Sequence, residues 1–370
     1  MKVLHVDSGR DWRGGQNQVL LACTGMAARG HEVVLACRRG SPLEERARAQ
    51  QVTVSAVDFG GELSPRPAWQ VARLVREAQP HVVQAHDPHA ITASHAALRS
   101  RARRQLVATR RVDFVPRGVF ARWKYRAAAR VVAVSGAIRR ILSDAGVDDA
   151  RLRLVYEGVP DRPAAAGGRE ALRVLGVPEG APVVGNIAAL VDHKDHATLL
   201  RAAALVRPKR PDARFVIVGD GELRGALTAQ ARAAGLDGYV LFAGFREDVD
   251  RLLPAFDVFC LSSHMEGLGT IVLDAMAFAR PVVATAAGGI PESVADGVTG
   301  RLVPVRDHAA LAQALVAMLD DPTGAVAFGR AGRARYEERF SAERMVSETL
   351  AVYQELAPQG ATSRPDRGRQ

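Results

Sequence analysis

The sequence predicts an α/β protein made of two Rossmann-like domains, each with a parallel sheet. Three observations support this prediction. Apolar strand-like runs alternate with helix-like segments, a linker of small residues interrupts the alternation once, and 370 residues are many for a single hydrophobic core. Ligands of such sheets bind at the carboxyl ends of the strands, so we expect the two domains to face a central cleft that holds the site.

The first domain is expected to span residues 1–165. Its strand candidates are short apolar runs, a pattern typical of buried parallel strands. They are the segments 2–7, 32–37, 52–57, 82–85, 106–109 and 131–134. Helix-like stretches such as 16–29 and 68–78 lie between them, which predicts strand–helix–strand crossovers.

The second domain is expected over residues 166–340, where the alternation restarts after the linker PAAAGG at 163–168. Its strand candidates are the segments 183–187, 214–218, 240–242, 258–261, 282–284 and 301–303. The final residues, 359–370, are polar and contain glycine and proline, so we predict a disordered tail.

The composition is that of a globular protein, 48% hydrophobic and 24% charged. No run approaches the ~18 apolar residues of a membrane span, and the start MKVLHV resembles a strand more than a signal peptide. Cys23, Cys37 and Cys260 are far apart in apolar contexts, which suits reduced thiols. We therefore expect a cytoplasmic protein.

The segment 262–291, SSHMEGLGTIVLDAMAFARPVVATAAGGIP, is the most informative part of the chain. A strand candidate leads into Glu266, and a glycine-flanked turn then opens a helix-like stretch that contains Asp274. An open helix N-terminus beside a strand end attracts anions, because free backbone N–H groups and the helix dipole point at the ligand. Two acids nearby suit the hydroxyls of a sugar or ribose. The segment therefore predicts a nucleotide-sugar pocket.

Glu266 to Asp274 resembles the E-x7-E motif of retaining glycosyltransferases with the GT-B fold, the group 1 or family 4 enzymes. The second acid is Asp where the family has Glu, which is a departure from the motif. The resemblance implies that Glu266 contacts the transferred sugar and Asp274 the ribose. It also implies that the backbone amides of the turn hold the diphosphate; these belong to Gly267, Leu268, Gly269 and Thr270.

The resemblance carries further implications for the chain as a whole. The donor is expected to be a UDP- or GDP-sugar, bound as a substrate, with neither a cofactor nor a catalytic metal. A helix at about 341–357 is expected to cross back onto the first domain and complete it. The first domain is expected to hold the acceptor and the second domain the donor.

Lys194 lies just after the first strand candidate of the second domain and matches the lysine of the family's G-R-L-x-x-x-K pattern. We expect it to contact the donor diphosphate; a solvated loop lysine is the alternative. The arginine and glycine of that pattern are replaced by Ala189 and Ala188. His193, His196 or an arginine from the first domain are candidates to supply the missing cation.

Three further elements are expected at the site. Gly14 and Gly15 precede the first helix and let a bound group approach the backbone closely, although an ordinary turn is the alternative. His86 follows a strand candidate, and the resemblance implies that it lies near the transferred sugar; a packed or capping histidine is the structural alternative. The resemblance also implies that Gly219 and Gly221 lie in a turn near the nucleotide base.

Two other patterns need interpretation. Asp248 and Asp250 form a D-x-D sequence, which we interpret as a helix start rather than a metal site, with Asp248 as the N-cap. The segment 288–292, GGIPE, resembles the family's G-G-x-P-E turn, and its glycines are expected to let a ligand approach the backbone.

The net charge of +10 is concentrated in one region: residues 99–140 contain thirteen basic side chains and one acid. Within it, Arg122, Arg126 and Arg130 are spaced four apart, which predicts a basic ladder on one helix face, with Phe120 and Trp123 nearer the other. This pattern is typical of a helix that lies on an anionic membrane. The alternative is that the aromatic residues are core and the arginines are solvated or bind acceptor anions.

Arg110 and Arg111 directly follow a strand candidate and are expected to meet the acceptor inside the cleft. Nucleic acid is not an expected partner, because no helix-turn-helix or RNA-binding signature accompanies the basic region.

With these observations, the resemblance implies a retaining glycosyltransferase that moves a sugar from a nucleotide-diphosphate-sugar to a cell-envelope glycan or lipid-linked acceptor. Such an enzyme is expected in the cytoplasm or at the inner face of the cytoplasmic membrane. Two alternatives stay open: a non-hydrolysing nucleotide-sugar epimerase of the same fold, and a non-catalytic, membrane-associated protein with a degenerate version of it.

Overall fold

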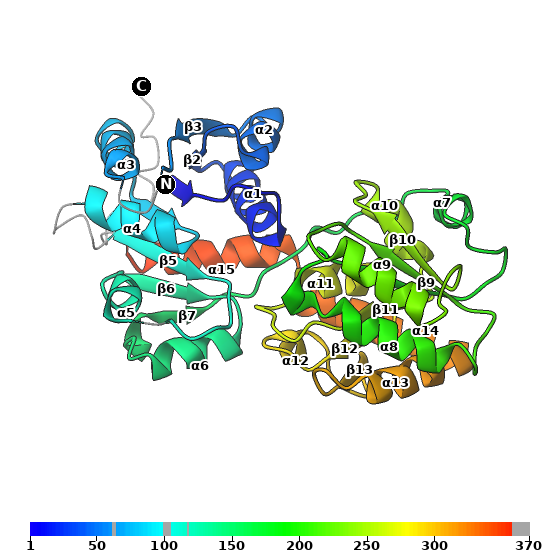
Figure 1. Cartoon of the computed structure of the whole chain (residues 1–370). Coiled ribbons are helices and arrows are strands. Elements are labelled where there is room, and N and C mark those ends of the chain that lie inside the picture. Colours follow the sequence, from blue (N-terminus) through cyan, green and yellow to red (C-terminus); the bar gives the residue numbers. More distant parts are fainter. Residues whose placement is uncertain (61–63, 99–104, 117, 357–370) are drawn as a thin grey trace, which may run out of the picture.

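The structure is a computed structural model that describes residues 1–60, 64–98, 105–116 and 118–356 (Figure 1). The predicted tail at 359–370 and part of the basic region, at 99–104 and 117, lie outside the described residues.

The N-terminal sheet has seven parallel strands in the order β3-β2-β1-β4-β5-β6-β7. They are β1 (Lys2–Asp7), β2 (Glu32–Arg38), β3 (Thr53–Val57), β4 (Val82–Ala85), β5 (Leu106–Arg110), β6 (Arg130–Ala133) and β7 (Leu152–Leu154). The six predicted strands are all present, within one residue at each end. Strand β7 was not predicted, because its three residues, LRL, are too few to show an apolar pattern.

Helices cover both faces of this sheet, as two separate hydrophobic clusters show. One face carries α1 (Gly14–Ala27), α2 (Pro42–Ala49) and α15 (Ala342–Gln354); the other carries α3 (Arg66–Ala78), α4 (Pro88–Ala97), α5 (Val119–Arg126) and α6 (Gly136–Asp144). The short 3-10 turn η2 (Asp149–Arg151) precedes β7.

Helix α15, drawn in red, lies against the N-terminal elements although it is the last helix of the chain (Figure 1). Its buried Met345, Val346 and Tyr353 belong to the same cluster as Val19 and Cys23 of α1. The Tyr353 hydroxyl also donates a hydrogen bond to the Gln84 side chain on β4. The predicted helix at 341–357 therefore packs on the N-terminal sheet.

The C-terminal sheet has six parallel strands in the order β10-β9-β8-β11-β12-β13. They are β8 (Val183–Ile187), β9 (Arg214–Val218), β10 (Val240–Gly244), β11 (Val258–Leu261), β12 (Val282–Thr285) and β13 (Gly300–Val303). The short 3-10 turns η3 (Asp192–Lys194) and η4 (Leu253–Ala255) follow β8 and precede β11.

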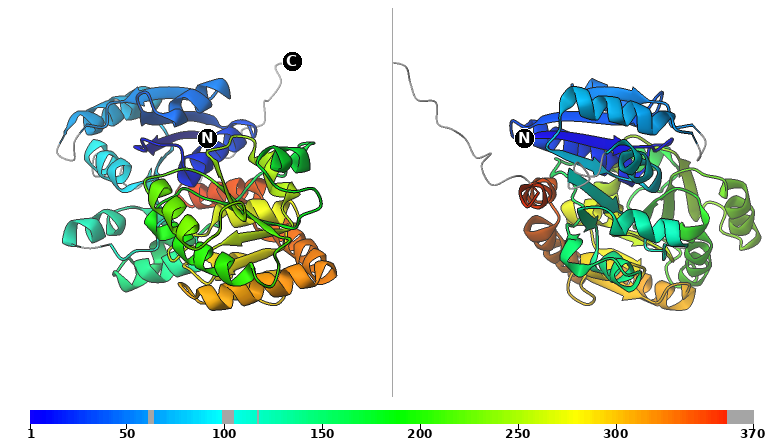
Figure 2. Two further views of the ribbon diagram at one scale, coloured as in Figure 1. Left: turned by 45° about the vertical axis from the view of Figure 1, so that its right-hand side comes forward. Right: turned by 90° about the vertical axis from the view of Figure 1, so that its left-hand side faces the viewer.

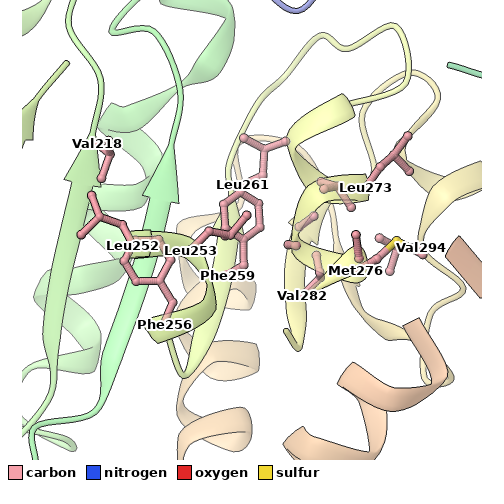
Figure 3. Close-up of a cluster of buried hydrophobic side chains, with 14 of the residues drawn as sticks. Val218, Leu252, Leu253, Phe256, Phe259, Leu261, Leu273, Met276, Val282 and Val294 are labelled. Carbon is pink, nitrogen blue, oxygen red and sulfur yellow. The ribbon is translucent and has the colours of Figure 1, made fainter. Parts of the chain in front are cut away.

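Two clusters also fill the two faces of this sheet. One face carries α8 (His196–Val206), α9 (Arg224–Ala233) and α13 (His308–Asp320). The other carries α7 (Gly168–Val174), α10 (Val249–Leu252), α11 (Thr270–Ala277), α12 (Ile290–Ser293) and α14 (Pro322–Arg339). Figure 3 shows this second cluster, in which Phe256 and Phe259 pack near Leu261, while Leu273 and Met276 project from α11. The dense apolar support holds the start of α11 in place.

The two sheets form two separate masses, one blue to blue-green and the other green to orange (Figure 1), and Figure 2 shows them from two further sides. In each sheet the winding reverses beside the first strand, between β1 and β4 and between β8 and β11. Binding crevices form outside the carboxyl ends of strands at such points. The prediction of two Rossmann-like parallel-sheet domains is confirmed.

Candidate functional site

Helix α11 begins with a free N-terminus beside the end of β11. Gly269, in the left-handed conformation with φ of 76°, precedes it, no side chain caps its first amides, and its first turn contains no acid. The backbone N–H groups at Thr270 and the residues after it therefore point outward with the positive end of the helix dipole. This arrangement matches the anion site that the sequence predicts.

Lys194 and Glu266 form an ion pair at this helix start. Lys194 follows β8 and Glu266 follows β11; because these strands are neighbours, the residues meet although 72 positions separate them. The Ser263 hydroxyl donates to the same Glu266 oxygen, Oε1, at 2.8 Å. The side chains of Lys194 and Glu266 are only 19% and 9% exposed, so their charges are weakly screened by water.

The N-terminal domain brings a second free helix start to the same place. Helix α1 has no side-chain cap at Arg13 and no acid in its first turn. A Cβ atom added to Gly14 would lie 3.0 Å from Thr270 Oγ1, so the two helix starts touch across the domain boundary. Gly15 in turn faces the aliphatic part of Arg111. The two glycine loops therefore face one another.

His86, the predicted contact of the sugar, is buried in a chain of hydrogen bonds. Arg111 Nη1 donates to His86 Nδ1 at 3.2 Å, so Nε2 carries the His86 proton and donates to His5 Nδ1 at 2.8 Å. Arg111 Nε also donates to Glu157 Oε1 at 2.9 Å. Both ring nitrogens of His86 are thus engaged within its own domain, and a contact with the sugar would require one of these bonds to break.

Burial controls the protonation of the histidines and carboxylates in and around this hydrogen-bonded network. Desolvation, together with the positive charge of Arg111, lowers the pKa of His5 to about 3 and lowers that of His86 well below its usual value. Desolvation raises the pKa of Glu157, against the opposing effect of Arg111. Desolvation and the nearby Asp87 raise the pKa of Asp7 to about 6. Both histidines are therefore neutral at neutral pH.

Asp274 projects from α11 toward the chain segment that connects the domains. Arg162 Nη2 donates to Asp274 Oδ1 at 2.7 Å, and Arg162 also pairs with Asp250. Desolvation raises the pKa of Asp274 to about 6, although Arg162 opposes the shift. No motif or spacing in the sequence indicates this pairing, because Arg162 lies outside every motif.

Near the site, each domain also supplies a carboxylate that accepts hydrogen bonds from backbone amides of the other domain. Glu292, in the predicted GGIPE turn, accepts hydrogen bonds from the first amides of α6 in the other domain, at Gly136 and Ala137. Reciprocally, Asp113 accepts a hydrogen bond from the Glu266 amide at 3.0 Å. We call these two contacts the reciprocal clasp. The only signal in the sequence was that Asp113 is the single acid in a strongly basic region.

Several predicted glycines sit at close approaches between chain segments. A Cβ atom at Gly267 would lie 2.1 Å from the Arg111 carbonyl oxygen, and one at Gly289 would lie 2.8 Å from Ser135 Cβ. These glycines let the domains touch. Gly219 and Gly221 instead allow the loop after β8 to pass, since their Cβ atoms would lie 1.9 Å and 2.5 Å from its carbonyl oxygens.

Arg110 does not point toward the site, in contrast to the expectation. It is buried, donates to the Tyr125 hydroxyl at 3.1 Å and stacks on Phe114. Successive residues at a strand end point to opposite faces, so Arg110 turns toward α5 whereas Arg111 turns toward His86.

The predicted arginine ladder is wrong at its last residue. Helix α5 ends at Arg126, and Arg130 lies on β6, where it forms an ion pair with Glu355. Arg122 remains exposed, and Arg126 is exposed but donates to the Ala145 carbonyl oxygen. A four-residue spacing continues along the sequence past the point where the helix stops.

The aromatic residues of α5 are exposed. Phe120 and Trp123, stacked on each other, are 59% and 40% exposed, which excludes the alternative that both are core residues. With exposed neighbours they form what we call the apolar patch. Its members are Val112, Phe114, Val115, Val119, Phe120 and Trp123.

The D-x-D sequence lies at a helix start, as interpreted, with Asp248 at the N-cap position of α10 and Asp250 in its first turn. Asp248 precedes α10, but its carboxylate pairs with Arg246 and makes no capping hydrogen bond. Within the described part of the chain, no group of three or more His, Cys, Asp or Glu side chains is arranged to hold a metal ion. None of the described helices is both long and apolar enough to cross a membrane.

A large cavity of about 1180 Å³ lies away from the carboxyl ends of the strands. It is lined by residues that precede β8, β11 and β12, such as Pro182, Asp257 and Pro281, and by parts of α7 and α14. Its arginines are mostly paired, for example Arg169 with Asp257. We assign the site to the domain boundary, where the free helix starts and the charged pair converge, rather than to this cavity.

Comparisons with known proteins identify the family of the chain. Residues 12–162 match the model for glycosyltransferase family 4, and residues 181–321 match the model for glycosyl transferases group 1. The chain is 35% identical, over 49% of each chain, to a GDP-mannose-dependent phosphatidylinositol monomannoside mannosyltransferase of Corynebacterium glutamicum. It is 32% identical to the lipopolysaccharide core biosynthesis glycosyltransferase LpsE of Rhizobium meliloti, over 48% of this chain and 51% of LpsE.

The chain thus spans about half the length of these curated relatives. The structural match is more extensive: the crystal structure of Anabaena HepE with UDP superposes with a TM-score of 0.84, at 23% identity, over 96% of this chain and 100% of HepE. The two family models, the two parallel sheets and the helix starts that face each other lead to one conclusion: the chain belongs to the group 1 (family 4) glycosyltransferases and has their GT-B fold.

Proposed function

We propose that this protein transfers a sugar from a nucleotide-diphosphate-sugar to a cell-envelope glycan or lipid-linked acceptor, with retention of the anomeric configuration. The observation that carries the proposal is the Lys194–Glu266 ion pair at the free N-terminus of α11. It combines a cation, open amides and a carboxylate at one strand end, which suits a sugar diphosphate.

The ion pair suggests how the donor would bind. A diphosphate at the start of α11 attracts the Lys194 ammonium away from Glu266. The Glu266 carboxylate is then free to accept hydroxyl hydrogen bonds from the transferred sugar, with Ser263 still holding one of its oxygens. As the glycosidic bond breaks, Lys194 and the α11 amides stabilise the negative charge that grows on the leaving diphosphate.

The N-terminal domain supplies the second half of the site. Gly14 and the start of α1 face Thr270 directly, so a donor at α11 also meets this loop. Arg111, held by Glu157 and His86, lies with its aliphatic part against Gly15 of this loop, and we assign it the role of the cation missing at Ala189.

The apolar patch and the basic residues beside it suggest where the acceptor approaches. Exposed aromatic and aliphatic side chains next to Arg122 and Arg126 suit an anionic membrane surface that carries a lipid-linked acceptor. The two curated relatives act on a phosphatidylinositol mannoside and on the lipopolysaccharide core, as their names state. We therefore propose a peripheral position on such a surface.

A donor screen followed by one substitution tests the proposal. UDP- and GDP-sugars are compared by thermal shift, because a ligand that binds only the native state raises its stability. With the donor found, Lys194→Ala is expected to lower kcat/KM by about 100-fold, the loss of one strong electrostatic contact to the leaving group. Lys209→Ala is the matched control, since Lys209 is an exposed lysine that follows α8.

Two outcomes contradict the proposal. Absence of binding for every nucleotide-sugar would favour a degenerate, non-catalytic protein. Conversion of the donor alone into its epimer would favour the epimerase. A change of less than threefold for Lys194→Ala would remove the role assigned to the lysine.

A further inference from the structure

Arg162, in the segment between the domains, binds Asp274 on α11, the helix whose start is proposed to hold the donor. Its Nη2 donates to Asp274 Oδ1 at 2.7 Å, and its Nη1 lies 2.9 Å from Asp250 Oδ1 at the start of α10. The other oxygen of Asp274, Oδ2, has no hydrogen-bond partner among the residues that the structure describes. One oxygen of the carboxylate is therefore fixed and the other is left open.

The location of Asp274 makes the open oxygen significant. Asp274 lies one helical turn after Thr270, the residue that touches the Gly14 loop, and on the same side of α11. Its side chain keeps 15% exposure. A ligand anchored by its diphosphate at the start of α11 would thus place its next hydroxyls near Asp274.

The surroundings of Asp274 make Arg162 necessary for its charge. Burial favours the protonated acid, and Asp250 on α10 adds negative charge. From α14, Tyr336 and Arg333 lie close by, but Arg333 is already paired with Asp161 and Glu337. Arg162 is therefore the cation that directly compensates Asp274.

We propose that Arg162 is a positioning residue for the donor: it holds Asp274 charged and oriented so that Oδ2 accepts a ribose hydroxyl of the nucleotide. This inference rests on the proposed function, because it needs a nucleotide-sugar at α11. It also explains the shorter acid, since Asp274 acts as a unit with Arg162 rather than alone. Because Arg162 belongs to the segment between the domains, movement of that segment changes the ribose contact.

The test compares two arginines that both hold this segment. Arg162→Met removes the charge and keeps the length of the side chain; Arg333→Met is the matched control, since Arg333 binds Asp161 and, among the described residues, makes no hydrogen bond or ion pair with Asp274. Donor affinity of the full chain is measured by calorimetry from pH 5.5 to 8.5. We expect Arg162→Met to weaken binding about tenfold at pH 7, and more at lower pH, because Asp274 becomes protonated. Arg162→Lys should restore most of the affinity.

A readout without donor separates this inference from the proposed function. An acid with a raised pKa in the folded state loses stability as pH rises from its unfolded value, near 4, to its folded value, here about 6. In Arg162→Met this loss should extend to higher pH, and adding Asp274→Asn should abolish it. Because Arg162 also pairs with Asp250, the part of the loss that Asp274→Asn removes is the measure of the Arg162–Asp274 coupling, and it needs no donor.

Each outcome decides the question. If the wild type binds a donor and Arg162→Met keeps its affinity and pH profile, the inference is overturned and the proposed function stands. If the donor-free comparison shows no coupling, Arg162 does not hold the charge of Asp274 and the inference is again overturned. If the wild type binds no nucleotide-sugar at all, the proposed function fails and the ribose contact fails with it.

Discussion

Glu292→Gln should loosen the contact between the domains without disturbing either core. In the structure, Glu292 Oε2 accepts from the Gly136 amide at 2.6 Å and Oε1 from the Ala137 amide at 2.8 Å, while the Tyr156 hydroxyl donates at 3.1 Å. Glutamine keeps the shape but removes the negative charge at the N-terminus of α6. It also replaces one acceptor oxygen by an NH₂ group that faces an amide donor.

The magnitude follows from these contacts. A charge at a helix N-terminus contributes about 0.3–1 kcal/mol, and a hydrogen bond to a charged group about 1.5 kcal/mol or more, so the closed arrangement should lose about 2 kcal/mol. This corresponds to about a 30-fold change in the ratio of closed to open molecules. If catalysis needs the closed form, kcat/KM should fall when that ratio drops below one.

Domain separation can be measured directly by fluorescence transfer between two labels. Cys23, Cys37 and Cys260 are buried, so exposed cysteines introduced by Arg76→Cys on α3 and Arg232→Cys on α9 can be labelled selectively. Glu338→Gln is the control, because the Glu338 side chain is exposed and makes no ion pair with a described residue. Equal label distances and equal kcat/KM in the Glu292 and Glu338 variants would refute the idea that the reciprocal clasp holds the domains together.

Two further predictions follow from the buried histidine chain and from the apolar patch. His5 has a folded pKa of about 3, below its unfolded value of about 6.5, so it stabilises the fold above pH 6.5 and this stability is lost as the pH falls toward 3. His5→Phe should flatten that part of the stability curve in urea unfolding; an unchanged slope relative to wild type would argue against a buried neutral His5. Trp123→Ser should reduce flotation with anionic vesicles several-fold, whereas Trp69→Ser, which changes a more exposed tryptophan (62%) on α3, should not. Equal flotation of both variants would exclude the apolar patch as the membrane contact.

Much of the fold could be predicted because parallel strands are short apolar runs between helices, and each run can be recognised in the sequence without knowledge of the others. The anion site could be predicted for the same reason: strand, glycine turn and helix are consecutive in the sequence around Gly267–Thr270. The pairing of Lys194 with Glu266 needed the order of the strands, which places β8 beside β11. The motif pattern suggested that both residues serve the donor, but not that they bind each other.

The contacts between the domains could not be predicted. The partners of Asp113, Glu292 and Arg162 come from distant parts of the chain, and they depend on how two separate cores dock. No periodicity or spacing in the sequence records that docking. The wrong prediction for Arg130 has a local cause instead. Alanine favours helix, so the three alanines after Arg126 suggest that α5 continues, whereas the helix ends at Arg126.

The position of α15 affects the order in which the protein can fold as it is synthesised. The N-terminal sheet is complete once β7 has been made, but its core still lacks Met345, Val346 and Tyr353. These residues emerge from the ribosome only after all strands of the C-terminal sheet have been synthesised. The first domain therefore remains incomplete while the second domain is made, because α1 and α2 cover this face of its sheet only in part. During that interval the nascent chain should depend on chaperones, and a chain interrupted before residue 342 should be degraded rather than accumulate as a separate folded half.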